Sequence, residues 1–595
     1  MNTIKTQWDL SGFYSSLDDP KFENDLKEVE QLVDTFCTKY KGKIKLFTEK
    51  DFEPYFQDSE TIRKKVYVIT HYLGYLSSLD TQNQIVIKKE GELEQKFVEL
   101  SNKQLFISEE FKTIGYDKLM QFSKLKSLEK YSNYFFQKAQ SLRYLLDEKT
   151  EFALNLKDPC GGSAFNQLYS ELTNSFMFPI KKEGKKVLVT ESEIRALRHS
   201  VNAQERKDAF KSLFNVFGDK KVQITTGNIY SALVKDSTSE VKLRGFSSVM
   251  APRNISEELD DAVVNTLLTE VEKAYPLYHR YLKAKAKFFG QKKLSLYDMY
   301  APLETEKKEY SFDDALKLYL DLIKRFDEEF YTYSKDMFEN GRVDVFPKQG
   351  KRGGAFASYE QGFESFVLLN HADRIDDVRT LAHELGHAMH GHLSQKQPSQ
   401  VYDSTLSLAE TASVFNELLI STELEKQLSN SEKLGFLAHS LEDFFATIFR
   451  QVQYVLFEKR VHQAFYDGKS LTYEDFNLLW REEQEKLLGK SVKFVVKPNQ
   501  EIGWSTIPHI FRTPFYCYSY AFGNLLSIAL YSKYLKEGKS FVPKYKQILS
   551  AGGSKRPYEL LLEHGFDISK SEFFKTGLDF IEHEVEKFEK LVFKK

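Results

Sequence analysis

The strongest constraint on the fold of this 595-residue chain comes from five consecutive residues, His383-Glu384-Leu385-Gly386-His387. Histidines four residues apart lie on one face of an α-helix, about 6 Å from each other, so both imidazoles can reach one ion if the segment is helical. Zinc binds nitrogen ligands at about 2.1 Å and keeps one position open when it is catalytic. The motif therefore predicts a helix that carries two metal ligands.

Glu384 is the candidate general base on this predicted helix. Its side chain is rotated about 100° from that of His383, so the carboxylate can stand beside the ion and take a proton from water. Two ligands and a general base at this spacing are typical of metal-dependent peptide hydrolysis. The alternative is a surface helix with two solvated histidines. Only 13 of the 595 residues are histidine, so the pattern arises by accident in roughly two of a hundred such chains.

The residues around the motif favour a helix with one buried side. Apolar residues recur there at helical spacing: Val378, Leu381, Leu385 and Met389. Asp373 or Asp376 can cap the start of this helix, and Gly391 can mark its end.

Gly386 lies inside the predicted helix, where glycine costs about 1 kcal/mol relative to alanine. Two interpretations stay open at this point. Either the glycine is simply tolerated, or another element approaches the helix closely at this position.

A third metal ligand has to come from elsewhere in the chain. A third histidine in the extended form of the motif would require glycine at position 390 and histidine at position 393. The chain has His390 and Leu393 instead, which excludes that class. His390 shares a face with His383 but lies about 10.5 Å along the axis, so we expect it to support the ligands from behind or to face the substrate.

A carboxylate on a following helix is the better candidate. The segment 407–417 carries two glutamates seven residues apart, Glu410 and Glu417, which lie on one helical face. Glu410 as a ligand and Glu417 as the partner of a ligand imidazole form a coherent pair. An ordinary solvated helix face is the alternative. The flanking Leu, Ala, Val and Phe residues make the face look buried, and a buried carboxylate needs a metal or another partner.

With these residues in view, the chain resembles the thimet oligopeptidase group, and specifically its oligoendopeptidase F branch. The motif through His390, with Glu410 and Glu417 beyond it, carries the resemblance. Shorter pieces along most of the chain are also similar to that branch: Trp8-Asp9-Leu10-Ser11, Leu172-Thr173-Asn174-Ser175-Phe176, Thr190-Glu191-Ser192-Glu193, Ala551-Gly552-Gly553-Ser554 and Glu559-Leu560-Leu561.

The resemblance implies a zinc endopeptidase that cuts short peptides inside a deep channel between helical walls. It implies that His383, His387 and Glu410 bind one Zn²⁺ ion and that Glu384 activates the water. It also implies that a histidine and tyrosines further along the chain stabilise the oxyanion, and the matching stretch here is 508–520.

That stretch supports the same role on physical grounds. Attack on a peptide carbonyl develops negative charge, which preorganised donors stabilise in a dry site. Tyr516 and Tyr520 are four residues apart and can point at one pocket if a helix starts after Pro514. We favour Tyr520 and His509 as the donors, with Tyr516 second. The alternative is aromatic packing, because 14% of the chain is aromatic.

Two short strands are predicted ahead of the metal-binding helix, at 353–357 and 365–370. An extended peptide can add main-chain hydrogen bonds at a strand edge, and the resemblance implies that this region holds the substrate. Gly354, Ala355 and Phe356 are the candidate substrate-binding residues, since a small side chain lets a peptide lie close. A plain hairpin that covers the core is the alternative.

The overall composition excludes several classes of partner. The chain has 84 basic and 86 acidic residues, a net charge of −2 and three scattered cysteines. Nothing in this balance favours nucleic acid or an anionic membrane surface, and the cysteines fit reduced thiols. The N-terminus lacks the apolar core of a signal peptide, and no apolar run reaches about 18 residues. We therefore expect a cytoplasmic monomer that acts on short peptides.

Few prolines and long amphipathic stretches predict a mainly α fold. We expect a large helical two-part architecture that encloses a deep substrate channel, with a small β-sheet near the zinc helix. Residues 1–195 form a helical N-terminal domain that ends in a β-hairpin, at 176–180 and 187–189, followed by a capping box of Thr190 and Glu193. Residues 196–595 form the zinc metallopeptidase catalytic domain.

The predicted function is that of a zinc-dependent endopeptidase for short unstructured oligopeptides, with water activated by zinc and a glutamate base. The alternative is a catalytically silent, peptide-binding helical protein whose metal is structural.

Overall fold

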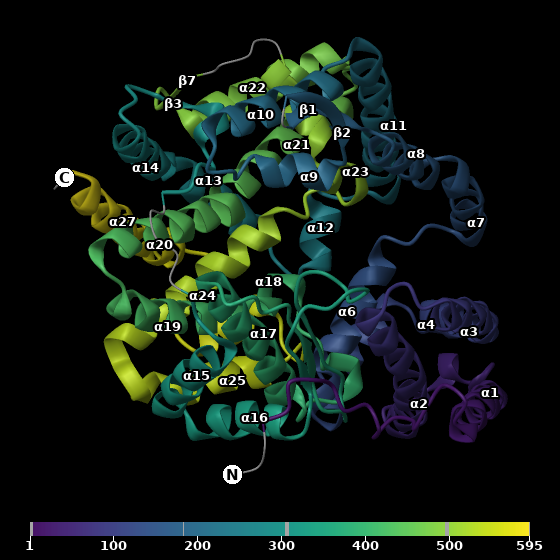
Figure 1. Cartoon of the computed structure of the whole chain (residues 1–595). Coiled ribbons are helices and arrows are strands. Elements are labelled where there is room, and N and C mark those ends of the chain that lie inside the picture. Colours follow the sequence, from purple (N-terminus) through teal and green to yellow (C-terminus); the bar gives the residue numbers. More distant parts are fainter. Residues whose placement is uncertain (1–3, 183, 304–308, 494–498, 594–595) are drawn as a thin grey trace.

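The computed structural model describes residues 4–182, 184–303, 309–493 and 499–593. Helices make up most of these residues, and the β-structure among them consists of three small sheets (Figure 1). The mainly α prediction is confirmed. In the described part of the chain, none of the helices has the length and apolar character needed to cross a bilayer.

The elements follow one another along the chain in three stretches. The first stretch contains α1 Pro20–Tyr40, α2 Phe52–Leu79, α3 Gln84–Lys103, α4 Phe106–Ile114, α5 Tyr116–Phe122, α6 Ser132–Arg143, α7 Glu148–Lys157, α8 Gly162–Asn174, β1 Phe178–Lys182, β2 Lys185–Val189 and α9 Glu191–Leu197. The second contains α10 Ala203–Phe217, α11 Lys220–Arg244, α12 Ala251–Ser256, α13 Asp261–Lys273, α14 Tyr275–Phe288, β3 Leu294–Ser295, α15 Phe312–Phe326, α16 Glu328–Glu339, β4 Val343–Asp344, β5 Phe356–Ser358 and β6 Phe366–Leu368. The third contains α17 Ile375–Ser394, α18 Leu406–Ala409, α19 Thr411–Gln427, α20 Asn430–Phe444, a π-helical turn Phe445–Phe449, α21 Arg450–Tyr466, α22 Tyr473–Leu488, β7 Val492–Lys493, a 3₁₀ segment Asn499–Thr506, α23 Pro508–Arg512, α24 Tyr518–Glu537, α25 Val542–Ser550, α26 Pro557–Glu563 and α27 Ser571–Phe593.

The first helices build a hydrophobic core of their own, which runs from Tyr14 to Ala139. In Figure 1 they form the purple and blue group at the lower right. The N-terminal segment ties this group to the rest of the molecule, because the Trp8 indole N–H donates to the carbonyl oxygen of Val367 on β6 at 2.8 Å. Arg63 on α2 also contacts Glu360 at 3.0 Å.

The predicted β-hairpin forms as β1 and β2, with the first strand beginning two residues later than expected. The predicted capping box of Thr190 and Glu193 is present at the start of α9. Phe178, Val189 and Ile194 share a small core with α10 and with Ile502. Residues on both sides of position 195 thus pack together, and the domain boundary there stays a prediction.

Helix α17 carries the H-E-x-x-H motif, as the sequence predicts, but its ends differ from the prediction. Asp377, not Asp373 or Asp376, caps the start by accepting from the backbone N–H groups of Ala372 and Arg374 at 2.8 and 3.0 Å. Asp373 has a left-handed backbone with a φ of 60°, which keeps it outside the helix. Its carbonyl oxygen accepts from the Tyr310 N–H.

The other end of α17 passes beyond Gly391 to Ser394, so Gly391 does not terminate the helix. A Cβ atom on Gly391 would lie 2.5 Å from a ring carbon of Tyr359. This glycine therefore makes room for an aromatic ring.

The structure decides between the two interpretations of Gly386, because another element, α19, does approach α17 closely at this position. A Cβ atom here would lie 2.6 Å from the Ala412 carbonyl oxygen and 2.7 Å from Cα of Ser413. Both are backbone atoms of α19, which cannot move aside as a flexible side chain would. The missing side chain therefore sets how closely α19, and Glu410 at its start, approach the motif helix.

We expect Gly386→Ala to lower the apparent melting temperature and to weaken metal binding. Overpacking of this kind costs about 1–3 kcal/mol, and it pushes the Glu410 segment away from the two histidines. Gly91→Ala is the matched control, because Gly91 lies inside α3 with no atom within 4 Å of the added Cβ. Alanine at that position stabilises the helix by up to about 1 kcal/mol. Thermal unfolding of both variants measures the difference, and equal melting temperatures would contradict the argument.

A three-stranded sheet lies beside α17, in the order β4-β6-β5. β6 pairs with β4 in parallel and with β5 in antiparallel orientation. The two strands predicted ahead of the motif are β5 and β6. Within the described residues β5 has one strand neighbour, so its outer edge is an edge strand of the sheet.

Candidate metal and peptidase site

Three side chains converge where α17 meets the start of α19. The donor atoms of His383, His387 and Glu410 all lie within 4.8 Å of one another. Glu410 Oε2 lies 3.4 Å from His383 Nε2 and 3.3 Å from His387 Nε2. Two imidazole nitrogens and one carboxylate facing a common point fit a divalent metal with one open coordination position.

Glu410 occupies the junction between α18 and α19, where it is the residue before the first residue of α19. The Ser413 hydroxyl donates to Glu410 Oε2 at 2.6 Å, and the Ser527 hydroxyl of α24 donates to the Glu410 carbonyl oxygen at 3.1 Å. Side chain and backbone are thus both fixed. The carboxylate points at the histidines without needing to rearrange.

His383 is oriented from behind by Glu417. Its Nδ1 atom lies 3.2 Å from Glu417 Oε2, which leaves Nε2 free for a metal. Such a contact fixes the ring tautomer and raises the basicity of a ligand imidazole. The sequence predicted this pairing of Glu417 with a ligand imidazole.

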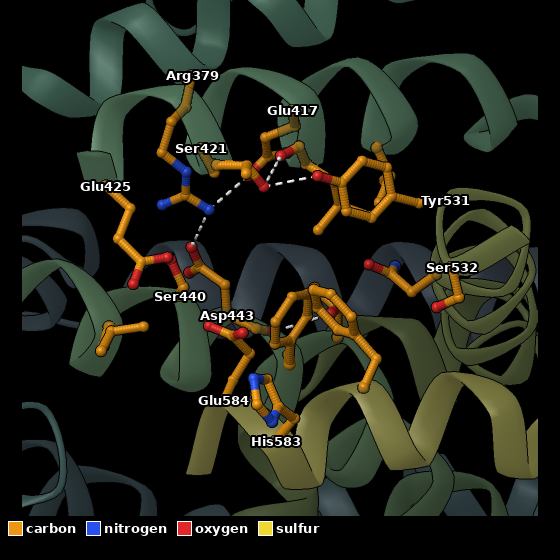
Figure 2. Close-up of a pocket in the computed structure, with 18 of the residues that line it drawn as sticks. Arg379, Glu417, Ser421, Glu425, Ser440, Asp443, Tyr531, Ser532, His583 and Glu584 are labelled. Atoms are coloured by element: carbon orange, nitrogen blue, oxygen red, sulfur yellow. Dashed lines mark hydrogen bonds and ion pairs between the residues drawn. The ribbon is translucent and has the colours of Figure 1, made fainter. Parts of the chain in front are cut away.

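Arg379 extends the chain of contacts, and its role was not predicted from the sequence. Its guanidinium bonds Glu417, donates to Asp443 of α20 at 3.1 Å and donates to His439 Nδ1 at 2.8 Å. Figure 2 shows Arg379 between Glu417 and Asp443. The available signal was an arginine four residues before His383 on a helix with a buried side, because a buried charge needs partners.

The site is electrically negative around the candidate ligands. Burial disfavours a charged imidazole, but the hydrogen bond and charge of Glu417, together with Glu410 and Glu384, raise the pKa of His383 to about 9. Burial also disfavours a charged Glu410, yet His387 and His383 lower its pKa to about 2. Carboxylates that stabilise a positive charge on His383 also stabilise a divalent cation at the same atoms.

Glu384 is buried beside the histidines, and burial raises the pKa of its carboxyl group. The nearby backbone of Ala357 on β5 partly offsets this rise in the pKa, and α17 packs against β5. The candidate base is therefore held against the edge strand. A raised pKa brings a carboxylate closer to the range in which it can accept a proton and return it.

Two cavities meet at these residues. One, of about 780 Å³, is bounded by α19, α20, α24 and α27 (Figure 2). Its lining includes His383, Glu410 and Tyr520. The other, of about 450 Å³, is lined by His383 and Glu384 and by Gly354 and Ala355 next to β5. Both are large enough to hold several residues of a peptide.

The predicted substrate-binding residues do not all face the same way. Gly354 and Ala355 line the second cavity, and Gly354 has a φ of 79°. The Phe356 ring lies 6.2 Å from the Trp8 ring, in the small core under the sheet. Alternation along the strand explains this difference, since successive side chains point to opposite faces. Phe356 therefore supports the strand from its far side.

His509, Tyr516 and Tyr520 form one aromatic cluster. Ring centroids are 5.8 Å apart for His509 and Tyr516, 5.1 Å for Tyr516 and Tyr520, and 6.2 Å for His509 and Tyr520. Tyr520 connects the cluster to the larger cavity, which it lines together with Glu410.

The helix expected directly after Pro514 begins later, at Tyr518. Phe515 adopts a left-handed backbone with a φ of 61°, and its N–H donates to Glu458 Oε1 at 2.9 Å. Tyr516 therefore lies in a turn rather than on the helix that carries Tyr520. Tyr518 is buried in the core and faces away from the cluster, as the sequence predicts.

His390 is buried one helical turn beyond His387. In the part of the chain that the structure describes, its Nδ1 atom is buried without a hydrogen-bond partner. His390 lines neither of the two cavities, and its supporting role behind the ligands stays a prediction.

Comparison with known proteins agrees with the peptidase chemistry that the site geometry suggests. The family model described as peptidase family M3 matches residues 196–580. Oligopeptidase PepF of Bacillus subtilis is 28% identical over 99% of this chain and 87% of its own length. An oligoendopeptidase F homolog of Lactococcus lactis is 27% identical over 99% of this chain and 98% of its own length.

Solved structures share the fold. A structure described as a putative peptidase from Chlamydophila abortus superposes with a TM-score of 0.87 at 23% identity, covering 99% of this chain and 100% of its own. Oligoendopeptidase-F from Enterococcus faecium superposes with a TM-score of 0.69 at 22% identity, covering 97% and 99%. The match of the M3 family model over more than half of the sequence, with relatives of the oligoendopeptidase F type along its whole length, shows that this chain is a peptidase that belongs to peptidase family M3.

Proposed function

We propose that the protein is a zinc-dependent oligoendopeptidase that hydrolyses short, unstructured peptides. The observation that carries the proposal is the convergence of His383, His387 and Glu410 within 4.8 Å, with buried Glu384 beside them. The cavities on both sides of this point supply room for a peptide on each side of the scissile bond.

In the proposed mechanism, different residues hold the ion, orient a ligand and transfer the proton. His383, His387 and Glu410 would hold the ion, and Glu417 would keep the His383 ring in place. Zinc held there supplies a Lewis acid that polarises the scissile carbonyl and lowers the pKa of water. Glu384 accepts the proton of the attacking water and later delivers it to the leaving amine.

The substrate would lie along β5. Its main chain would pair with the outer edge of this strand, and Gly354 and Ala355 would let it approach closely. Because Glu384 lines the same cavity as Gly354 and Ala355, a peptide paired at this edge would lie next to the base. This arrangement supports endopeptidase action on an extended chain.

A digest of a synthetic peptide library, followed by mass spectrometry, tests the proposal. We expect internal cleavage of short peptides, loss of activity after treatment with a chelator and recovery when zinc is added back. The rival function, a silent peptide-binding protein with a structural metal, predicts binding without products. Intact peptides after incubation with zinc-loaded protein would overturn the proposal.

Tyr520 and His509 are proposed to stabilise the oxyanion, with Tyr520 as the hydroxyl that lines the cavity. We expect Tyr520→Phe to lower kcat by about 10²–10³-fold, the usual loss of one such donor, with a smaller change in KM. Tyr518→Phe is the matched control. In the described part of the chain the buried Tyr518 hydroxyl has no hydrogen-bond partner, so its removal leaves kcat unchanged. Equal rates for the two variants would exclude the proposed role of Tyr520.

A further inference from the structure

A third cavity, of about 150 Å³, lies on the far side of the α20–α21 segment from the larger cavity. Asp443, Phe444 and Thr447 line the larger cavity. Glu442, Ala446 and Arg450, from the same stretch, line the third one. The stretch includes the π-helical turn Phe445–Phe449, a feature that is frequent at functional sites.

Three arginines line this cavity, which we call the arginine cavity: Arg195, Arg198 and Arg450. Arg195 is neutralised by Glu191 at 2.5 Å. Glu442, the carboxylate in the lining, forms an ion pair with the fully buried Lys285. The positive charges of Arg198 and Arg450 therefore remain uncompensated by these carboxylates.

Arg198 and Arg450 contact aromatic rings and a phenol in place of carboxylates. The Arg198 guanidinium lies 5.1 Å from the Tyr300 ring centroid and 5.7 Å from that of Phe210, and no carboxylate among the described residues pairs with it. Arg450 donates to the Tyr300 hydroxyl. Burial would raise the pKa of Tyr300, but Arg450 and Arg198 lower it. Both guanidinium groups therefore lie close enough to Tyr300 to favour a negative charge at that position.

Further unpaired groups around the arginine cavity are donors. Within the described residues, Arg450 Nε, Gln453 Nε2 and Trp480 Nε1 are buried without a hydrogen-bond partner, and all three residues line the cavity. Its wall is therefore rich in donors and poor in acceptors. A ligand that fits this chemistry is an acceptor and carries negative charge.

We propose that the arginine cavity binds an oxyanion group, a carboxylate or a phosphate, through Arg198 and Arg450. The fork of a guanidinium matches the two oxygens of such a group, and the volume admits a phosphate ion. The group can belong to a small free anion or to the carboxylate of the peptide. The assignment to the peptide carboxylate rests on the proposed function.

The arginine cavity borders two parts of the peptidase site. Arg195 donates to the carbonyl oxygen of Thr506 at 3.0 Å, and Thr506 and Ile507 line the cavity directly ahead of α23, which carries His509. On the other side, Glu442 precedes Asp443, which bonds Arg379. An anion bound there thus lies against the segment that leads to the aromatic cluster.

The first arm of the test titrates zinc-loaded protein with inorganic phosphate in a chloride-free buffer, by calorimetry. We expect saturable binding by the wild type, a loss of affinity of at least about tenfold in Arg198→Met, and an intermediate loss in Arg198→Lys, which keeps the charge but not the fork. Arg143→Met is the control, because Arg143 is exposed and lines none of these cavities. Zinc content equal to that of the wild type shows that each variant is folded, and Arg450→Gln provides a second variant.

The second arm compares one quenched peptide with a free C-terminal carboxylate and the same peptide as an amide. We expect kcat/KM of the wild type to favour the free acid by about tenfold if the peptide is the source, and Arg198→Met to bring the ratio to about one. Phosphate binding that depends on Arg198, together with a wild-type acid-to-amide ratio of about one, assigns a free anion. If Arg198→Met behaves as Arg143→Met does in both arms, the arginine cavity is not an anion site. Hydrolysis of the amide by the wild type reports the proposed function separately.

Discussion

Glu384→Gln should keep the metal and lose catalysis. The amide has the same shape as the carboxylate, but it cannot accept a proton. General-base catalysis contributes about 10²–10⁴-fold, so we expect kcat to fall by that factor while KM changes little. A quenched-peptide assay gives the rate, and elemental analysis gives the zinc content.

The zinc content makes this experiment decisive. Glu384 lies beside the candidate ligands and is not one of the three converging donors, so its amide should leave one zinc per chain. A variant that holds zinc and cleaves peptides at the wild-type rate would remove Glu384 from the reaction. A variant without zinc would instead make it a ligand.

Glu410→Ala should abolish stoichiometric zinc binding and, with it, peptide cleavage. The substitution removes one of three donors and leaves two imidazoles, which no longer complete the site. Loss of an outer partner alone costs 10–100-fold in affinity, and we expect loss of a direct ligand to exceed about 100-fold. Competition with a chromogenic chelator measures the dissociation constant.

Glu423→Ala serves as the matched control for this variant. It lies on the same helix, α19, and pairs with Arg325 and Lys426 rather than with the histidines. We expect zinc affinity equal to that of the wild type. Tight, stoichiometric zinc in Glu410→Ala would show that the third ligand is another residue.

Much of this arrangement could be predicted from local sequence. At their spacing, His383 and His387 can reach one ion only if the segment is helical, and both lie on α17. A glycine within the motif left two interpretations open, and packing against α19 decided between them. Glu410 and Glu417 could be singled out because carboxylates on an apolar helix face need partners. The edge strand could be predicted because short segments of β-forming residues lie next to glycines.

The remaining features depend on residues far apart in the sequence. Asp373 leaves the helix because its carbonyl oxygen accepts from Tyr310, and α24 starts late because Phe515 is held by Glu458. Arg379 meets Asp443 only when α17 and α20 pack together. Local propensity contains no information about such pairs, and the sequence analysis missed each of them for this reason.

The glycine contact between α17 and α19 has a consequence for how the proposed zinc site would be loaded. The backbone packing at Gly386 already brings Glu410 up to the histidines. The entropic cost of ordering these side chains therefore falls on folding and not on metal binding. In zinc fingers, by contrast, the cation itself drives folding and its removal denatures the domain. Here demetallation should leave a folded apoprotein whose preorganised donors recapture the ion, so that loading can respond reversibly to the free zinc concentration.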